Sequence, residues 1–238
     1  MKKLFLLSFA LLTFGFSEGN AQTLQNFFDE ADALFGTYVS GGNVDYKAIK
    51  EDPSLLNSAL KKAEQLRISE SDSKSYQAFW INAYNLLVIK AIVDNFPIKS
   101  PLDKKGFFDK SKHQVGGTSI TLNDIENKKL RAKFGDARFH FVLVCGAKGC
   151  PPLIGKAYTA INLEKLLEQQ TINALNNSSF IKVSNGKVAF SEIFKWYKED
   201  FVAGGRTEVD FLNTYRKEKV PSDAKVTYYS YDWRLNSK

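Results

Sequence analysis

The sequence has little cysteine and little histidine, with two of each in 238 residues. So few cysteines cannot form a disulfide scaffold, and the fold must therefore depend on a hydrophobic core. A zinc site has a weak basis as well, because the two cysteines stand in a C-x4-C spacing and the histidines are scattered. We therefore expect neither a bound metal nor another cofactor.

Long apolar runs are missing beyond the first residues. Lys2 and Lys3 precede an apolar run over residues 4–16, and Gly19-Asn20-Ala21 has the small-x-small pattern of a cleavage site. This predicts a signal peptide over residues 1–21. No later run reaches the roughly 18 to 20 apolar residues of a membrane helix. We expect an exported protein, periplasmic or secreted, with no integral membrane segment in the mature chain.

The sequence also lacks a block of charge. Its formal net charge of +7 falls to +6 when residues 1–21 are removed, because they contain two lysines and one glutamate. The positive charges are spread as single and paired lysines, whereas a nucleic-acid binder concentrates them on one face of a recognisable module. The pattern is typical of a solvated surface, and we expect no nucleic-acid partner.

Hairpins and amphipathic helices are what the sequence does contain. Gly116-Gly117 and Asn185-Gly186 are two-residue turns between short β-type segments, and residues 225–230 predict a closing strand. Apolar residues at helical spacing predict helices from Leu24 to near Gly41 and over about residues 53–66, 74–95, 123–134, 163–175, 191–203 and 209–215. We predict an α+β fold, a single domain over residues 22–238 in which a mostly antiparallel sheet with hairpins packs against several helices.

The predicted helix over residues 74–95 is apolar nearly all round, which is typical of a buried helix. It carries two amides, Asn82 and Asn85, which then need hydrogen-bond partners inside the protein. They either bind backbone groups of neighbouring loops or line a site.

Residues 138–152, RFHFVLVCGAKGCPP, contain both cysteines and one histidine. The β-branched and aromatic run predicts a buried strand, in which His140 and Cys145 point to opposite faces. Cys150 follows a turn with two glycines and could fold back toward either residue.

Four interpretations of the cysteines stay open. Export favours a disulfide between Cys145 and Cys150 across the short turn. Alternatively, Cys150 or Cys145 is a nucleophile with His140 as its base, oriented by Asn82, Glu126 or Asp232. The thiols could also bind a metal with a histidine, or be free and buried. Pro151 excludes Cys150 from the first turn of a helix, a common means of activating a thiol.

Six segments together resemble the family called domain of unknown function 547. They are VDY at 44–46, FWINAYN at 79–85, TLNDIENKKLR at 121–131, RFHFVLVCGAKGCPPL at 138–153, SEIFKWYKEDF at 191–201 and YDWRLN at 231–236. The resemblance implies exported bacterial relatives, and plant relatives in which aspartate replaces the second cysteine. It thereby favours His140, Asn82 and Asn85 over Cys150 as a shared site.

We predict a pocket between the Asn82 helix and the His140 segment that binds a small polar or peptide-like ligand. Its further binding residues are Asn85, Glu126, Arg138 and Asp232. One alternative is a papain-like or transglutaminase-like hydrolase or acyltransferase that uses Cys150 and His140. Another is a non-enzymatic interaction module of the cell envelope, in which the aromatic residues from Trp196 to Trp233 serve only for packing.

Overall fold

A computed structural model of the protein describes residues 14–238. Residues 1–13, most of the predicted signal peptide, lie outside the described residues. The first helix, α1 (Phe14–Tyr38), runs across the predicted cleavage point after Ala21. The cleavage itself stays a prediction.

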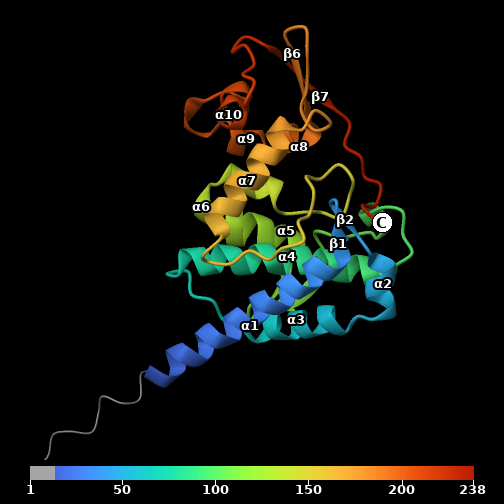
Figure 1. Ribbon diagram of the computed structural model, residues 1–238, viewed down its shortest axis with the longest axis vertical. Coiled ribbons are helices and arrows are strands. Elements are labelled where there is room, and N and C mark those ends of the chain that lie inside the picture. Colours follow the sequence, from blue (N-terminus) through green and yellow to red (C-terminus); the bar gives the residue numbers. More distant parts are fainter. Residues whose placement is uncertain (1–13) are drawn as a thin grey trace, which may run out of the picture.

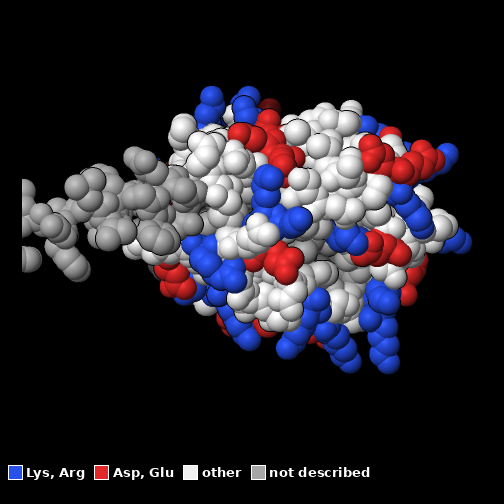
Figure 2. Space-filling model, turned by 90° about the horizontal axis from the view of Figure 1, so that it is seen from below, with Lys and Arg blue, Asp and Glu red and all other residues white. Residues whose placement is uncertain are grey.

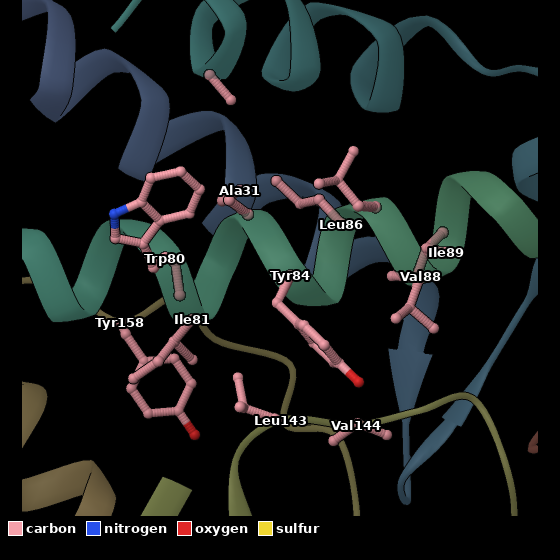
Figure 3. Packing of buried hydrophobic residues seen from close by; sticks show 14 of the residues in the cluster. Ala31, Trp80, Ile81, Tyr84, Leu86, Val88, Ile89, Leu143, Val144 and Tyr158 are labelled. Atoms are coloured by element: carbon pink, nitrogen blue, oxygen red, sulfur yellow. The ribbon is translucent and has the colours of Figure 1, made fainter. Parts of the chain in front are cut away.

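A layer of helices forms the N-terminal half of the fold (Figure 1). It consists of α1, α2 (Tyr46–Glu51), α3 (Ser54–Gln65) and α4 (Ser73–Asn95), with α1 packed against both α3 and α4. The predicted helix over residues 74–95 is confirmed as α4, which begins at an Asp72 cap. Its all-round apolar surface explains its position, because it is covered on every side. Figure 3 shows Ile81 and Tyr84 pointing from α4 toward the segment of Leu143 and Val144, while Leu86 points the opposite way.

The predicted helix over residues 123–134 is helical throughout but irregular. It consists of α5 (Leu122–Asp124), a π-helical segment η2 (Ile125–Arg131) and α6 (Ala132–Phe134). Thr121, and not Asn123 as predicted, caps its start, because the Thr121 hydroxyl accepts the Asp124 N–H. The Asn123 carboxamide instead accepts from Asn127 Nδ2.

Small sheets flank the helices. β1 (Val39–Ser40) pairs with β2 (Asn43–Val44), and β3 (Lys112–Val115) pairs with β4 (Thr118–Thr121), both antiparallel. β5 (Lys182–Ser184), β6 (Lys187–Ser191) and β7 (Lys225–Tyr229) form the third sheet, in which only β6 and β7 run parallel. Both predicted hairpins are confirmed: Gly116 and Gly117 have φ of 60° and 72°, as a type I′ turn requires. The architecture is α+β, as predicted.

The C-terminal part packs above α4 in Figure 1 around a core of its own. Its helices are α7 (Leu163–Asn176), α8 (Glu192–Trp196), α9 (Lys198–Phe201) and α10 (Glu208–Tyr215). The short 3-10 turns η1 (Pro101–Asp103) and η4 (Ala203–Gly205) complete the elements outside the central segment. Phe194 stacks on Phe201 in this core, with ring centroids 4.1 Å apart.

The predicted strand after Arg138 is wrong. Residues Ala137–Phe141 form a 3-10 helix, η3, which Asp136 caps, and residues 142–152 form no strand beyond an isolated bridge between Ala147 and Leu235. Phe139 packs into the core around α4 and Phe141 into the C-terminal core, so this segment joins the two cores. The run is apolar because it is buried between two hydrophobic cores, a situation that sequence alone does not distinguish from a buried strand.

The surface carries charges of both signs. On the face in Figure 2, basic and acidic side chains lie next to one another. Elsewhere among the described residues, charged side chains form ion pairs, such as Lys133 with Glu70 and Lys62 with Glu30. Among the described residues, no helix combines the length and the apolar character that crossing a membrane requires.

Candidate functional site

A cavity of about 240 Å³ lies where α4, η2 and η3 meet the C-terminal part. Ten of its thirteen lining residues are aromatic or carry an ionisable side chain. The lining residues are Tyr84, Phe108, Asn123, Glu126, His140, Leu143, Cys145, Cys150, Ile193, Trp196, Tyr197, Tyr231 and Trp233. Three of the predicted site residues, His140, Glu126 and Cys150, are thus brought together here with Cys145.

His140 is buried and held by a carboxylate. Its Nε2–H donates to Asp200 Oδ2 at 2.7 Å, and Asp200 in turn accepts from Arg131 Nε at 2.6 Å and Nη2 at 3.0 Å. Burial alone raises the pKa of the Asp200 carboxyl, but the hydrogen bonds and charges of His140 and Arg131 outweigh burial and hold that pKa well below its usual range. An ionised carboxylate only accepts, so Nε2 carries the hydrogen, and in the neutral form of the ring Nδ1 is then the acceptor.

The other edge of the imidazole faces a second carboxylate. Glu126 Oε1 lies 3.8 Å from His140 Nδ1, beyond hydrogen-bond distance, and Glu126 itself lines the cavity. Tyr197 stacks on the imidazole with ring centroids 4.1 Å apart, and the Arg131 guanidinium covers the Tyr197 ring at 4.7 Å. Burial and the Glu126 charge raise the pKa of Tyr197. Its hydroxyl is therefore a hydrogen-bond donor at neutral pH.

The π-helical segment η2 explains how Glu126 and Arg131 reach the same site. They are five residues apart, which in an α-helix turns their side chains roughly 140° away from each other. In a π-helix residues i and i+5 are joined by a hydrogen bond and lie nearly one turn apart. Both side chains of η2 therefore face the environment of His140 and Asp200.

The two cysteines form another part of the wall. Both are free thiols, so the predicted disulfide is absent, but the two Sγ atoms are only 2.6 Å apart. Cys150 Sγ also accepts from the Tyr231 hydroxyl at 2.8 Å and from the Cys145 backbone N–H at 3.0 Å. Burial alone raises the pKa of Cys150, yet these donors outweigh it and lower that pKa, whereas burial and the neighbouring sulfur raise the pKa of Cys145.

The C-terminal segment fixes the turn between the cysteines. The Lys148 N–H donates to the Arg234 carbonyl and the Gly149 N–H to the Asp232 carbonyl, at 2.7 and 2.8 Å. Gly149 lies against the Tyr231 ring so closely that a Cβ there would be 2.8 Å from the ring carbons. A glycine at this position therefore lets the Tyr231 hydroxyl reach both sulfurs.

Aromatic side chains form the outer wall of the cavity. Trp196 stacks on Trp233 with ring centroids 5.8 Å apart, and Tyr231 lies 4.7 Å from Trp233. Trp196 is 46% exposed, which is unusual for so large an apolar side chain. Trp196, Tyr231 and Trp233 all line the cavity, so each has a surface open to it as well as packing contacts with the others.

Asn82 and Asn85 do not line the cavity, which corrects the predicted pocket. Asn82 Nδ2 donates to the Tyr158 carbonyl at 2.7 Å, and the Tyr158 N–H donates to Asn82 Oδ1 at 3.0 Å. Asn85 makes the equivalent pair with the Val142 carbonyl and the Val144 N–H, both at 2.9 Å. Each amide thus replaces the strand neighbour that the irregular backbone lacks.

Two other predicted binding residues also lie elsewhere. Arg138 is paired with Asp136, at 2.7 Å from Nη2 to Oδ2, and with Glu164. Asp232 is paired with Arg234 and lies outside the cavity lining. Within residues 14–238, no three histidine, cysteine, aspartate or glutamate side chains are grouped so that they could hold a metal ion.

Sequence reasoning missed Arg131, Tyr197 and Asp200 as site residues, although each lies in a segment that carried the family resemblance. Asp200 comes 60 residues after His140 in the chain. Its signal was an acidic residue three positions after Tyr197 on a predicted helix, which by itself is typical of an ordinary amphipathic helix.

Comparison with known proteins gives one match. No curated protein matches this chain, and no solved structure matches it. The model of the family described as "Protein of unknown function, DUF547" matches residues 68–173, a range that contains Glu126, His140 and both cysteines. Residues 68–173 of this chain therefore form a domain of the DUF547 family.

Proposed function

We propose that the domain binds a small polar or peptide-like ligand in the cavity beside His140. The observation that carries the proposal is the composition of that cavity, in which acceptor groups at the base meet an aromatic outer wall. A volume of about 240 Å³ fits a ligand, or a ligand end, of roughly the size of one amino acid.

The polar groups of the cavity favour a ligand that donates hydrogen bonds. Glu126 offers a carboxylate, the neutral form of His140 offers the Nδ1 lone pair, and the thiol of Cys150 has a lowered pKa. The faces of Trp196 and Trp233 suit a flat apolar group or a cation. We infer that the ligand carries an ammonium or amide N–H group next to an apolar part, as the amino end of a peptide does.

Calorimetric titration tests this with two probes that differ in one group. Phenylalanine amide has a free ammonium group, and N-acetylphenylalanine amide does not. We expect the first to bind more tightly, and Glu126→Gln to weaken it roughly tenfold, because the lost interaction is a charged hydrogen bond. The matched control is Asp232→Asn, which removes a carboxylate outside the cavity. Equal affinities for the two probes, or equal effects of the two variants, would contradict the proposal.

A thiol hydrolase or acyltransferase is the second candidate. The lowered pKa of Cys150 favours it, together with His140, which lines the same cavity and is hydrogen-bonded to Asp200. The expected signature is an acyl group on Cys150 after exposure to an activated ester, formed and released repeatedly, and retained without turnover in His140→Ala. Mass spectrometry measures both steps.

The setting of this function is outside the cytoplasm. The basic start, the apolar run over residues 4–16 and the small residues before Gln22 support export through a signal peptide. If the ligand is bound without turnover, the domain is a recognition module of the cell envelope or the medium. The N-terminal sequence of the protein secreted by its host tests this, and a start at Gln22 is the expected result.

A further inference from the structure

The two cysteines have a geometry that ligand binding does not require. We propose that Cys145 and Cys150 are a redox-active dithiol that reduces the disulfide of a small thiol, with Cys150 as the attacking sulfur and Cys145 as the resolving one. The proposal stands on the contacts between the two sulfurs and Tyr231, and it does not depend on recognition of an ammonium group by Glu126.

Cys150 is built to carry the negative charge of a thiolate. Three donors converge on its sulfur: the Cys145 thiol at 2.6 Å, the Tyr231 hydroxyl at 2.8 Å and the Cys145 backbone N–H at 3.0 Å. The lowered pKa of Cys150 agrees with this arrangement. Since the thiolate is the nucleophile in disulfide exchange, Cys150 is the sulfur that attacks.

Cys145 is placed to complete the exchange. Its Sγ is already within 2.6 Å of Cys150 Sγ, so bond formation needs little movement of the chain. Its pKa is raised, which keeps it protonated until Cys150 has reacted. Tyr231, whose hydroxyl also lies 3.0 Å from Cys145 Sγ, can then stabilise the charge on the second sulfur.

The reaction balances as two successive exchanges. The Cys150 thiolate attacks one sulfur of the substrate disulfide, forms a mixed disulfide and releases the first small thiolate, which takes up a proton. Cys145 loses its proton and attacks Cys150 Sγ, which forms the Cys145–Cys150 disulfide and releases the second thiol. The protein dithiol loses two electrons and two protons, and the substrate disulfide gains them.

The surroundings of Cys150 limit the substrate to a small disulfide. Cys150 borders the aromatic cavity and also a second hollow lined by Pro152, Phe180 and Tyr229. Both cysteines are partly exposed at this position. A cavity of about 240 Å³ admits one half of a small disulfide, and its aromatic wall favours a half with a flat apolar group.

The test uses the full chain, reduced and freed of reductant in the absence of oxygen, with dithiobis(nitrobenzoate) as the aromatic disulfide. We expect wild-type protein to release about two equivalents of thionitrobenzoate in sequence and to end with an internal disulfide and no adduct. Cys145→Ser should release about one equivalent and retain one thionitrobenzoate on Cys150. Mass spectrometry distinguishes the two products.

Two outcomes would overturn the proposal. One is a wild-type product with an adduct on each cysteine and no internal disulfide. The other is a first step in Cys150→Ser that is as fast as in Cys145→Ser. Cys145→Ala provides the same comparison if the serine variant does not fold.

Tyr231→Phe tests the donor without removing a sulfur. We expect the first step to slow roughly tenfold at neutral pH, because the thiolate loses a hydrogen bond from a hydroxyl. For the same reason, the pH at which this step reaches half of its maximal rate should rise. An unchanged rate and midpoint would remove Tyr231 from the site. The control is Tyr215→Phe in α10, which removes a hydroxyl outside both hollows and should leave the exchange unchanged. The exchange is measured by thionitrobenzoate release, and ligand binding by calorimetry with phenylalanine amide. The two proposals can therefore fail independently.

Discussion

The polar groups buried along α4 and those around the cavity differ in how completely their hydrogen bonds are formed within the protein. Asn82 and Asn85 each donate one hydrogen bond and accept another, all to backbone groups of segments that lack regular structure. Around the cavity, His140 Nδ1 lies 3.8 Å from Glu126 Oε1, beyond hydrogen-bond distance. Cys150 Sγ is the reverse case, with more donors than a neutral thiol needs.

This difference separates structural roles from chemical ones. A buried amide with all its partners inside the protein has nothing left to offer a ligand, and its removal leaves unpaired backbone groups. A ring nitrogen without a close partner, or a sulfur that collects donors, is poised for a bond that the protein alone does not complete. The amides should therefore affect stability and the cavity residues mainly affect binding and reactivity.

The largest loss of stability is expected for Asn85→Leu. Leucine keeps the volume but leaves the Val142 carbonyl and the Val144 N–H buried without partners, and each such group costs about 1 to 3 kcal/mol. We expect the free energy of unfolding to fall by about 4 kcal/mol, measured by urea denaturation.

Asn57→Leu is the matched control, because Asn57 is exposed on α3. Its effect should stay within about 0.5 kcal/mol. If the two leucine variants were equally stable, the Asn85 amide would not hold the segment from Val142 to Val144.

Asp200→Asn should have the next largest effect, about 2 kcal/mol at neutral pH, because it weakens the charged hydrogen bonds of Arg131 and His140. The folded protein depresses the pKa of Asp200, so this stabilisation is present above the unfolded-state value of about 3.9. It is lost as the pH falls below that value toward the lower pKa of the folded state.

The difference between wild type and Asp200→Asn should consequently shrink as the pH is lowered from about 5 toward 2. Thermal unfolding over that range measures it. The exposed Asp223→Asn serves as the control, and a difference that grew in acid would show that Asp200 is not the ionised partner of His140.

Gly149→Ala probes the contact between the cysteine turn and Tyr231. A Cβ at 2.8 Å from the ring carbons must displace the ring, at a cost of about 1 to 3 kcal/mol. The variant should also react more slowly with dithiobis(nitrobenzoate), since the Tyr231 hydroxyl would move away from the sulfurs.

Gly36→Ala is the companion variant. Gly36 lies inside α1, and the nearest atom to its added Cβ is at 3.7 Å, an ordinary contact. It should stabilise the protein by about 0.5 to 1 kcal/mol. A Gly149→Ala variant as stable as Gly36→Ala would contradict the close contact between Gly149 and the Tyr231 ring.

The sequence predicted well what depends on local pattern. Helix α4, the two glycine-containing hairpins and the α+β class follow from apolar spacing and turn residues within short windows. The segment after Arg138 was wrongly predicted as a strand because its apolar residues pack into two different cores. Its backbone forms hydrogen bonds with the side chain of Asn85, which is 57 residues away from Val142 in the sequence.

The candidate site could be predicted only in part, because contacts between distant segments bring some of its residues together. His140, Glu126 and Cys150 were identified by their chemistry. Asp200 and Arg131 depend on features that sequence does not display: a contact between distant segments, and a π-helical turn that aligns residues five positions apart. Asn82 and Asn85 were correctly placed in the interior, but only their hydrogen-bond partners could show that they are structural.

The smallest effect on stability, and the sharpest contrast, is expected for Trp196→Ala. Because Trp196 is 46% exposed, its truncation should cost less than about 1 kcal/mol, whereas Trp80→Ala in the core around α4 should cost about 3 to 5 kcal/mol. The affinity for phenylalanine amide should instead fall roughly tenfold in Trp196→Ala, because the ligand loses an aromatic surface. Urea denaturation and calorimetry give the two values. If Trp196→Ala were as destabilising as Trp80→Ala and bound the probe with unchanged affinity, Trp196 would be a core residue. The proposal that it contributes to ligand binding would then be wrong.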